Sequence, residues 1–403
     1  MGDEFVIKEH EDILRVFERP KSRDQAISKL VTDVHYVRRD DKIDVLADNL
    51  RRNTDIQAVG VVDAEDRVAG VIVREEFFNV MVRPYARDVF KHRPVEEIMG
   101  EARTFSAEAN LFQVAEELTA TMKEPGIAYF VLTDETGRFN GVFSTQDMLV
   151  YLSDMTQSDI GLARDLQSRI VREREFVTGN TFELVSTAHT AKGVGGDFYD
   201  VRRYDEGKWL FAFCDVSGKG IAAAIVTAVI SGMIGVFDFA AHGVIPFVKK
   251  LNNYIVRTFE AEKFVTGIFL DYDERDGTLQ VCDMGHSHLF LYRRGRFVRL
   301  RNSRRNLPIG VVADVEPGYD TIRPRREDLL FLLTDGLIEQ GNADGEIYSL
   351  ERVANLLQDH AGAPVERVAD GILSDFNAFR GRHHLNDDVS FALMRFVEQE
   401  LTL

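Results

Sequence analysis

The hydrophobic and polar positions of the first 152 residues form one pattern twice. Residues 60–78 read GVVDAEDRVAGVIVREEFF, and residues 131–149 read VLTDETGRFNGVFSTQDML. Asp63 of the first copy corresponds to Asp134 of the second. Each copy is a short apolar strand, a charged turn, a second strand and the start of a helix, and a further helical segment precedes it. The pattern predicts two β-α-β-β-α units in tandem over residues 27–152, after an N-terminal segment of 26 residues.

A change of pattern at residues 153–180 predicts a helical linker. Apolar side chains recur there at spacings of three and four among charged residues, at Ile160, Ala163, Leu166 and Ile170. We expect a helix from about Ser158 to Val177, ended by Thr178-Gly179-Asn180. Its apolar stripe could pair with the stripe of a second copy, or it could pack on a neighbouring domain. Both alternatives stay open at this point.

Residues 181–398 alternate strands and turns, with long helices inserted. Residues 198–203 and 209–214 are two strand patterns joined by the turn sequence Asp205-Glu206-Gly207. In such a hairpin Asp197 and Asp215 face each other at the open end. The Ala-rich apolar run from Ile221 to Phe237 predicts a largely buried helix.

Two later strands carry aspartate at their ends in the same way. The apolar strand 329–333 is followed by Thr334-Asp335-Gly336, and Asn386-Asp387-Asp388 precedes the strand 389–395. A single aspartate in a turn is common and means little. Four strand ends that each offer aspartate beside a turn former predict a cluster of carboxylates at one sheet edge.

The cluster needs positive charge, because neighbouring carboxylates repel one another when they are removed from water. Nearby basic side chains are few, and we note only Lys192 and Lys219. Hard oxygen ligands suit Mg²⁺ or Mn²⁺. The sequence therefore predicts a metal site with two ions.

Composition narrows the class of protein. A chain of 403 residues predicts two or three domains, and 45% hydrophobic with 29% charged residues describes a soluble globular protein. No apolar run reaches the length of a membrane span, and the start of the chain lacks a signal-peptide pattern. Cys214 and Cys282 both lie in strand-like runs, which indicates reduced core residues. We therefore expect a cytoplasmic protein.

Charge argues against nucleic acid as a partner, since the net charge is −17. One segment differs from the rest: residues 292–305 read YRRGRFVRLRNSRR. Its alternation of arginine with apolar residues fits a solvated hairpin. The alternative is a docking rim for an acidic or phosphorylated protein.

The N-terminal repeats resemble a pair of CBS domains, also called a Bateman module. CBS pairs that bind adenine nucleotides carry a Ser or Thr and an Asp after the second strand, and Ser144-Thr145-Gln146-Asp147 keeps that motif. The equivalent Val73-Arg74-Glu75-Glu76 has no hydroxyl and a longer acid. The resemblance implies at most one nucleotide site, through Ser144 and Asp147. A CBS-like pair used only for dimerisation fits equally well.

The C-terminal motifs resemble those of the SpoIIE-like (RsbU-like) branch of the PPM family of metal-dependent protein phosphatases. They are GGDFYD, CDVSGKG, LLTDG and NDDVS in this order, with CDMGHSHLFLYRRG between the second and third. The resemblance implies an α-β-β-α sandwich of two antiparallel sheets flanked by helices. The whole chain is then an α+β multidomain protein.

Carried over by position, the resemblance implies a role for each aspartate. Asp215 bridges both ions, Asp197 and the carbonyl of Val216 complete one, and Asp335 completes the other. The last ligand is Asp387, with Asp388 as the second choice. Two such ions activate a water that attacks phosphorus.

Histidines take no clear part in the expected site. Eukaryotic relatives have a histidine two places after the bridging aspartate, and Ser217 stands there in this chain. We expect His286 to be structural, because it follows Gly285 at a strand turn. His383 and His384 lie just before the last acidic pair, and we assign no role to either.

The function implied is a protein serine/threonine phosphatase of bacterial signalling. Its substrate would be a phosphoserine or phosphothreonine on a regulatory protein of the anti-sigma-factor-antagonist type. The CBS-like pair would regulate it, with a homodimer as the expected assembly. One alternative is a catalytically silent scaffold that binds a phosphoprotein, which the complete acid set argues against. The other is a di-metal nucleotide phosphatase. This sequence has no base-stacking aromatic group near these motifs, which argues against that alternative.

Overall fold

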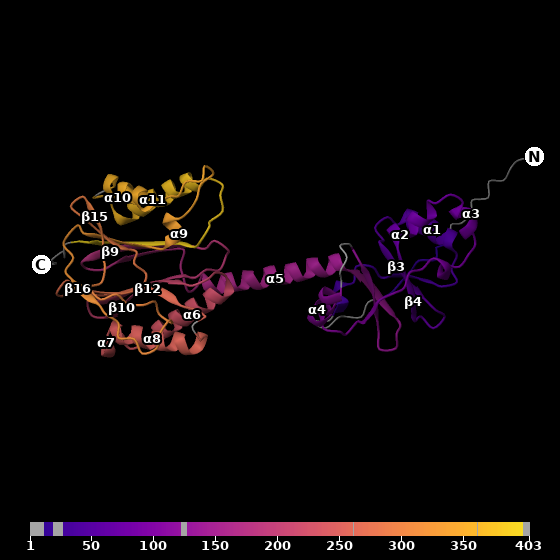
Figure 1. Cartoon of the computed structure of the whole chain (residues 1–403), viewed down its shortest axis with the longest axis horizontal. Coiled ribbons are helices and arrows are strands. Elements are labelled where there is room, and N and C mark those ends of the chain that lie inside the picture. The colour runs from indigo at the N-terminus through magenta and orange to yellow at the C-terminus, as the bar shows by residue number, and fades with distance from the viewer. Residues whose placement is uncertain (1–11, 19–26, 122–126, 261, 361, 398–403) are drawn as a thin grey trace, which may run out of the picture. The chain divides into compact units, whose positions relative to one another are not determined.

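The computed structural model describes residues 12–18, 27–121, 127–260, 262–360 and 362–397. The chain forms two compact units, Met1–Gln157 and Ser158–Leu403. The division falls within one helix, α5 (Thr145–Gln167) (Figure 1). The predicted N-terminal segment 1–26 lies outside the described residues except for 12–18, which include β1 (Arg15–Val16).

The N-terminal unit contains the predicted β-α-β-β-α order twice. The first copy is β2 (His35–Arg38), α1 (Ile43–Arg52), β3 (Ala58–Val62), β4 (Val68–Val73) and α2 (Arg74–Met81). The second is β5 (Thr104–Ser106), α4 (Leu111–Thr121), β6 (Tyr129–Thr133), β7 (Phe139–Ser144) and α5. Short helices η1 (Ile27–Leu30), α3 (Ala86–Phe90) and η2 (Val95–Glu97) complete the unit. In both copies the first two strands are parallel and the last two antiparallel.

The repeated aspartates, Asp63 and Asp134, accept equivalent hydrogen bonds in the two copies. One carboxylate oxygen of Asp63 accepts hydrogen bonds from the backbone of Glu65 and Arg67, at 3.0 and 2.9 Å. Asp134 accepts the equivalent pair from residues 136 and 138, at 2.8 and 2.9 Å. Aspartate closes a turn on its own backbone in this way. The repeat in the sequence is therefore a repeat of turn geometry.

The C-terminal unit is a sandwich of two antiparallel sheets. The five-stranded sheet has the order β10 (Asp197–Asp205), β11 (Lys208–Val216), β12 (Val265–Asp273), β13 (Thr278–Met284), β16 (Asp320–Ile322). The six-stranded sheet has the order β15 (Arg296–Arg299), β14 (Leu289–Arg293), β17 (Leu329–Leu333), β18 (Val389–Phe396), β9 (Phe182–His189), β8 (Arg174–Thr178). The helices are α6 (Ile221–Val236), α7 (Phe239–His242), α8 (Val244–Phe259), α9 (Asp335–Ile338), α10 (Leu350–Asp359) and α11 (Val365–Arg380).

Three apolar layers hold the sandwich together. One joins the five-stranded sheet to α6–α8, one fills the space between the two sheets, and one joins the six-stranded sheet to α10 and α11. Figure 1 shows these helices on the two outer faces. The strands β17 and β18 are buried on both faces, which explains the unbroken apolar run of β17 and the mainly apolar sequence of β18. The predicted α-β-β-α order is confirmed, and both cysteines are buried and free.

The linker prediction is wrong beyond Gln167. The helix ends there, and residues 174–178 form β8, which pairs with β9 at the edge of the six-stranded sheet. Residues 174–178 alternate between exposed and half-buried with the period of a strand. Ile170 lies outside the helix and packs against the α6–α8 layer, whereas Leu166 is 54% exposed.

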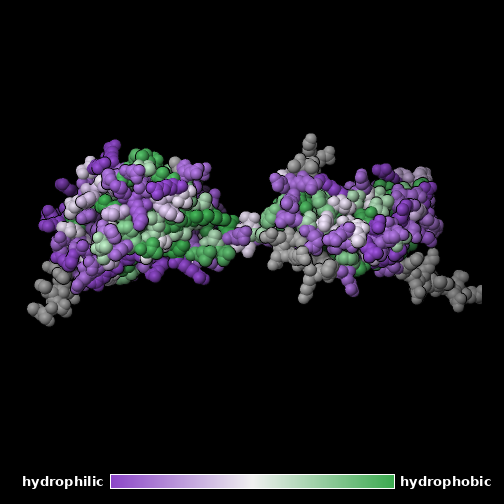
Figure 2. Space-filling view, turned by 90° about the horizontal axis from the view of Figure 1, so that it is seen from below, coloured by the Kyte–Doolittle hydropathy of each residue, from purple (hydrophilic) through white to green (hydrophobic). Residues whose placement is uncertain are grey.

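No helix in the described ranges is both long and apolar enough to cross a membrane. The face of the molecule in Figure 2 mixes hydrophilic and hydrophobic residues over both units.

Candidate metal centre

The β10–β11 hairpin places Asp197 directly opposite Asp215, as predicted. The two residues are Cα partners at the open end of the hairpin. Burial and the charge of Asp215 raise the pKa of Asp197 well above its usual value. Burial raises the pKa of Asp215 to about 7, with further contributions from Asp335, Asp387 and Asp388. Two carboxylates that resist ionisation side by side indicate a site that favours a cation.

Asp335 reaches the same edge from the other sheet. It is the first residue of α9, directly after β17 and Thr334. The Thr334 hydroxyl donates to a carboxylate oxygen of Asp197 at 2.9 Å, which joins the two sheets. A Cβ on Gly336 would lie 2.0 Å from the carbonyl oxygen of Asp388, so only glycine lets α9 lie against the start of β18.

The neighbours Asp387 and Asp388 have different surroundings. Asp388 is 6% exposed, and its carboxylate accepts from the backbone of Ala191 at 2.8 Å and of Gly196 at 2.7 Å. The carboxylate of Asp387 lies 2.8 Å from the ammonium of Lys219, and both side chains are 40% exposed. Asp388 therefore anchors the loop before Asp197. Asp387 is more exposed, and its carboxylate contacts the ammonium of Lys219 and accepts from the backbone of Asp388 at 2.9 Å.

Sequence reasoning missed Gln167, which holds the same loop from another side. Its amide donates to the carbonyl of Gly195 at 2.7 Å and accepts from the Gly195 backbone at 2.9 Å. The amide also donates to the Thr227 hydroxyl at 3.3 Å, and Gln167 is only 6% exposed. Gln167 is the last residue of α5. A glutamine at the end of a helix forms no motif, so no sequence signal marks this contact.

The basic side chains nearby neutralise little of this charge. Lys219 pairs with Asp387 and donates to the carbonyl of Asn386 at 2.7 Å. Lys192 makes no ion pair within the described part of the chain. Lys263, which the sequence did not single out, donates to the carbonyl of Ser217 at 3.1 Å.

Hydroxyl and imidazole groups at this edge are occupied by structural contacts. The Ser217 hydroxyl accepts from the backbone of Phe264 at 3.0 Å. The ring of His286 contacts the Thr266 hydroxyl at 3.0 Å and the carbonyl of Leu333 at 2.9 Å. Burial lowers its pKa to about 4, so the ring is neutral at pH 7. The geometry agrees with the structural role expected of His286.

The donor set fits hard divalent cations. Asp197, Asp215, Asp335 and Asp387 offer only oxygen, as does the carbonyl of Val216, which lies 2.7 Å from where a Cβ on Gly196 would stand. As the side chains lie, no three His, Cys, Asp or Glu groups of the described residues converge closely enough to hold an ion. Asp387 is turned to Lys219 and Asp197 to Thr334. Oxygen donors of this kind match Mg²⁺ or Mn²⁺.

In the N-terminal unit, Ser144 and Asp147 form a helix cap. A carboxylate oxygen of Asp147 accepts from the backbone and the hydroxyl of Ser144, at 2.7 and 2.6 Å. It also accepts from the Thr32 hydroxyl at 3.0 Å. Glu76, at the equivalent place of the first copy, is exposed. The two copies therefore differ at this position in structure as well as in sequence.

Comparison with known proteins adds a family and a fold. Residues 205–397 match the family described as Stage II sporulation protein E (SpoIIE). The phosphoserine phosphatase RsbP of Bacillus subtilis (strain 168) is 23% identical over 243 residues, which are 59% of this chain and 58% of RsbP. The phosphoserine phosphatase RsbU of the same organism is 21% identical over 243 residues, or 59% of this chain and 70% of RsbU.

A solved structure agrees with this match. The SiaA-PP2C domain of Pseudomonas aeruginosa aligns with a TM-score of 0.51 at 20% identity, over 61% of this chain and 98% of that domain. The chain spans little more than half the length of RsbP. The C-terminal sandwich therefore has the PP2C phosphatase fold, and residues 205–397 of it match the SpoIIE family.

Proposed function

We propose that this chain is a metal-dependent protein serine/threonine phosphatase. The observation that carries the proposal is that four aspartates from two sheets lie at one edge. Asp335 and Asp387 are close enough there to raise the pKa of Asp215, and Thr334 bonds to Asp197. The raised pKa of Asp197 and of Asp215 supports it, because these groups resist ionising without a cation. RsbP and RsbU are both named phosphoserine phosphatases, which supports phosphoserine as the residue that is dephosphorylated.

We assign the ligands as the motif order implies. In this assignment Asp215 would serve both ions of Mg²⁺ or Mn²⁺, Asp197 and the Val216 carbonyl would hold one, and Asp335 would hold the other, with Asp387 as the last ligand. Asp388 supports the loop in this assignment, because two backbone groups already occupy its carboxylate. When bound, such ions supply an activated water and offset charge on the phosphoryl oxygens. The chain itself orients Asp197 through Thr334 and holds the Gly195–Gly196 backbone through Gln167 and Asp388.

We further propose that α5 regulates the site, and the contact of Gln167 supports this. Any movement of the last turn of this helix moves the backbone of Gly195, two residues before Asp197. Leu162 and Leu166, one turn apart, are 62% and 54% exposed, which fits pairing with a second copy of the helix. A CBS-like N-terminal pair in a homodimer would deliver the signal, and the substrate would be a regulatory phosphoprotein of the anti-sigma-factor-antagonist type.

The proposal extends to an adenine nucleotide bound at the N-terminal unit. Asp147 must leave its helix cap, or share it, to bind a ribose. Calorimetry with AMP and ATP on the full chain tests it. Binding that depends on Asp147 and not on Glu76 supports the single site, whereas equal losses in Asp147→Ala and Glu76→Ala contradict it.

The phosphatase itself is tested by turnover. The full chain with Mn²⁺ should hydrolyse a phosphoserine peptide and p-nitrophenyl phosphate, and excess chelator should stop both reactions. Tight peptide binding without turnover would indicate a silent scaffold. Hydrolysis of nucleotides in place of the phosphopeptide would indicate a nucleotide phosphatase.

A further inference from the structure

Arginine side chains line a cavity at the edge of the sandwich. The cavity has a volume of about 440 Å³ and lies beside the loop between β13 and β14. Its charged wall consists of Arg299, Arg301 and Arg305, and its opposite wall includes Asp283 and Ser287. These arginines belong to the segment whose sequence left two interpretations open, a solvated hairpin and a docking rim.

The cavity lies at the same edge as the candidate metal centre. Gly285, in its wall, forms a bridge with Gly267 of β12, next to Thr266, the strand partner of Asp215. The ring of His286 contacts the carbonyl of Leu333, two residues before Asp335. One loop thus borders both the cavity and the aspartate cluster.

Polar residues between the arginines fix the wall in place. The side-chain amide of Asn302 donates to the carbonyls of Val281 and Gly318, at 3.0 and 3.1 Å. Asn306 donates to the carbonyls of Asp283 and Gly318, at 2.9 and 2.7 Å. The backbone thereby presents its arginines in a preformed arrangement, which lowers the entropy cost of binding.

The guanidinium groups in this wall have no carboxylate partner. Within the described ranges, none of Arg299, Arg301 and Arg305 forms an ion pair. By contrast Arg293, on the same hairpin, pairs with Asp328 through both nitrogens. Asp283 forms no ion pair with them among the described residues, and its carboxylate accepts from the backbone of residues 286 and 287 at 2.8 and 3.0 Å. Arg299 also lies over the ring of Phe290, 5.2 Å from its centre. In a chain of net charge −17, three arginines without a carboxylate partner among the described residues favour an anionic ligand in this cavity.

We propose that this cavity docks acidic side chains that flank the phosphorylated residue of the substrate protein. The proposal rests on the proposed phosphatase function and adds a substrate class to it. Guanidinium groups bind carboxylates in a bidentate manner and select them over neutral side chains. A cavity beside the cluster, bordered by the same loop, can hold such residues while the phosphoserine reaches the aspartates. Electrostatic attraction would also speed the encounter at low salt.

The test separates acidic flanks from the phosphate itself. Three substrates are compared on the full chain with Mn²⁺: p-nitrophenyl phosphate, a phosphoserine peptide with Asp and Glu flanks, and the same peptide with Asn and Gln flanks. The variant is Arg301→Glu with Arg305→Glu. The control is Arg294→Glu with Arg296→Glu, at the far end of the same hairpin.

We expect the variant to raise KM for the acidic peptide about tenfold, or about 1.4 kcal/mol, and to leave kcat and the p-nitrophenyl phosphate reaction unchanged. The neutral peptide should respond little, and the control pair should behave as wild type. Equal effects on both peptides, or no effect on either, would overturn the docking site. Fluorescence anisotropy with the same peptides measures docking separately from turnover. Absence of turnover would contradict the phosphatase function. Weak binding that does not depend on the flanking residues would contradict the docking site.

Discussion

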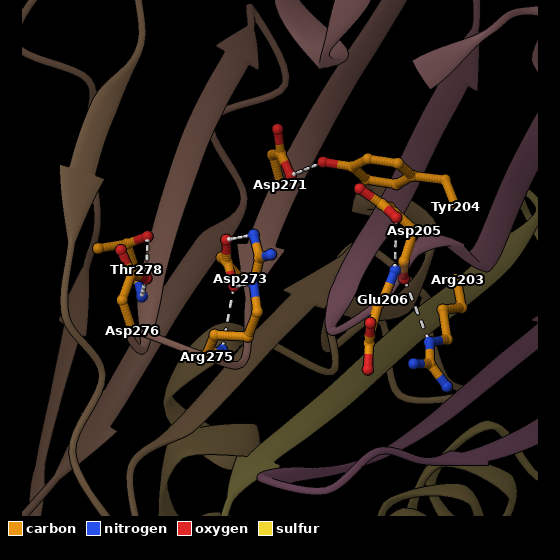
Figure 3. A network of polar contacts seen from close by, with 9 residues as sticks. All are labelled: Arg203, Tyr204, Asp205, Glu206, Asp271, Asp273, Arg275, Asp276 and Thr278. Carbon is orange, nitrogen blue, oxygen red and sulfur yellow. Dashed lines mark hydrogen bonds and ion pairs between the residues drawn. The ribbon is translucent and has the colours of Figure 1, made fainter. Parts of the chain in front are cut away.

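Both ends of the five-stranded sheet carry aspartates, but the side chains around them differ. At the hairpin-turn end, the guanidinium of Arg275 donates to Asp273 at 2.9 and 2.6 Å, and Thr278 donates to Asp276 at 2.6 Å (Figure 3). These hydrogen bonds lower the pKa of Asp273 and of Asp276. At the other end, burial and neighbouring carboxylates raise the pKa of Asp215.

The difference separates a structural cluster of acids from a functional one. At the turn end Asp273 and Asp276 each have a donor two residues away, so their charges stabilise the turn. At the other end the acids come from distant parts of the chain, and their donors are a hydroxyl, backbone groups and one exposed lysine. An arrangement that raises a buried acid's pKa costs stability unless a ligand offsets it. The number of aspartates is therefore a weaker sign of a site than the scarcity of positively charged partners for them.

The largest effect expected is on turnover, from one substitution at each end. Asp215→Asn should lower kcat by at least about 10²-fold, or about 2.7 kcal/mol of barrier, because it removes the ligand shared by both ions. Asp276→Asn, at the turn end, should leave turnover unchanged. The measurement is steady-state hydrolysis of p-nitrophenyl phosphate with Mn²⁺. A folded Asp215→Asn protein of wild-type rate would refute the metal assignment.

A smaller effect is expected from loosening the loop before Asp197. Gln167→Leu keeps the side-chain volume but removes the bonds to both backbone groups of Gly195. Turnover at limiting Mn²⁺ should fall about tenfold, or about 1.4 kcal/mol, within the range for a lost buried hydrogen bond. Ser168→Ala is the matched control, since that exposed hydroxyl bonds only to the carbonyl of Asp165. If both variants require the same Mn²⁺ concentration as wild type, α5 is a tether and not a regulator.

The two ends should also respond to pH with opposite sign in metal-free protein. The folded pKa of Asp215 lies near 7, above its usual 3.8, so the folded state binds more protons between these values. The free energy of unfolding should therefore fall as pH rises from about 4 to 7. The lowered pKa values of Asp273 and Asp276 act the other way: their stabilisation is present above 3.8 and is lost as pH falls below it.

Urea unfolding in chelator, at pH values from 5 to 8, measures this slope. Asp215→Asn should flatten it, and Mn²⁺ should raise the stability of wild type most at the upper end of the range. An unchanged slope in Asp215→Asn would show that Asp215 does not carry the titration. Asp276→Asn serves as the control, since its own titration lies below the range.

The sequence was sufficient for contacts that are local or follow from strand pairing. The short turn after Asp205 predicts that β10 and β11 pair as a hairpin with Asp197 and Asp215 at its open end. A β-bulge between Arg203 and Asp205, which the sequence did not reveal, shifts the register by one residue and places Asp197 opposite Asp215. The apolar run 329–333 and the segment 389–395 were both predicted as strands, and both are buried strands in the fold. The predicted linker helix was too long, because residues 174–178 are a segment of five residues with two charges and no clear strand pattern. Pairing with β9 makes this segment a strand.

Long-range side-chain contacts could not be found in the same way. Thr334 meets Asp197 across 137 positions and Gln167 meets Gly195 across 28, and neither pair has a spacing that a periodic pattern reveals. The different tasks of Asp387 and Asp388 depend on which backbone amides surround each, and that is settled only by the folded loop. Motif order favours Asp387 for the ligand, and the geometry adds a reason for it.

The smallest effect expected concerns the ion pair between Lys219 and Asp387 at the metal end. Lys219 holds Asp387 at 2.8 Å, and the pair is exposed enough that its free energy should not exceed about 1 kcal/mol. In the proposed assignment this ammonium competes with a metal ion for the same carboxylate. Arg275 differs, because its partner Asp273 is not a proposed metal ligand. Lys219→Met should therefore lower the Mn²⁺ concentration for half-maximal activity by a few-fold, up to about fivefold.

Arg275→Met at the turn end should leave the Mn²⁺ requirement unchanged while it weakens the turn. Metal titrations of both variants decide the matter: a higher Mn²⁺ requirement in Lys219→Met would mean that the lysine supports the site by another route, such as contact with the substrate phosphate. The competition between ammonium and metal would then be wrong, although the aspartate cluster would stand.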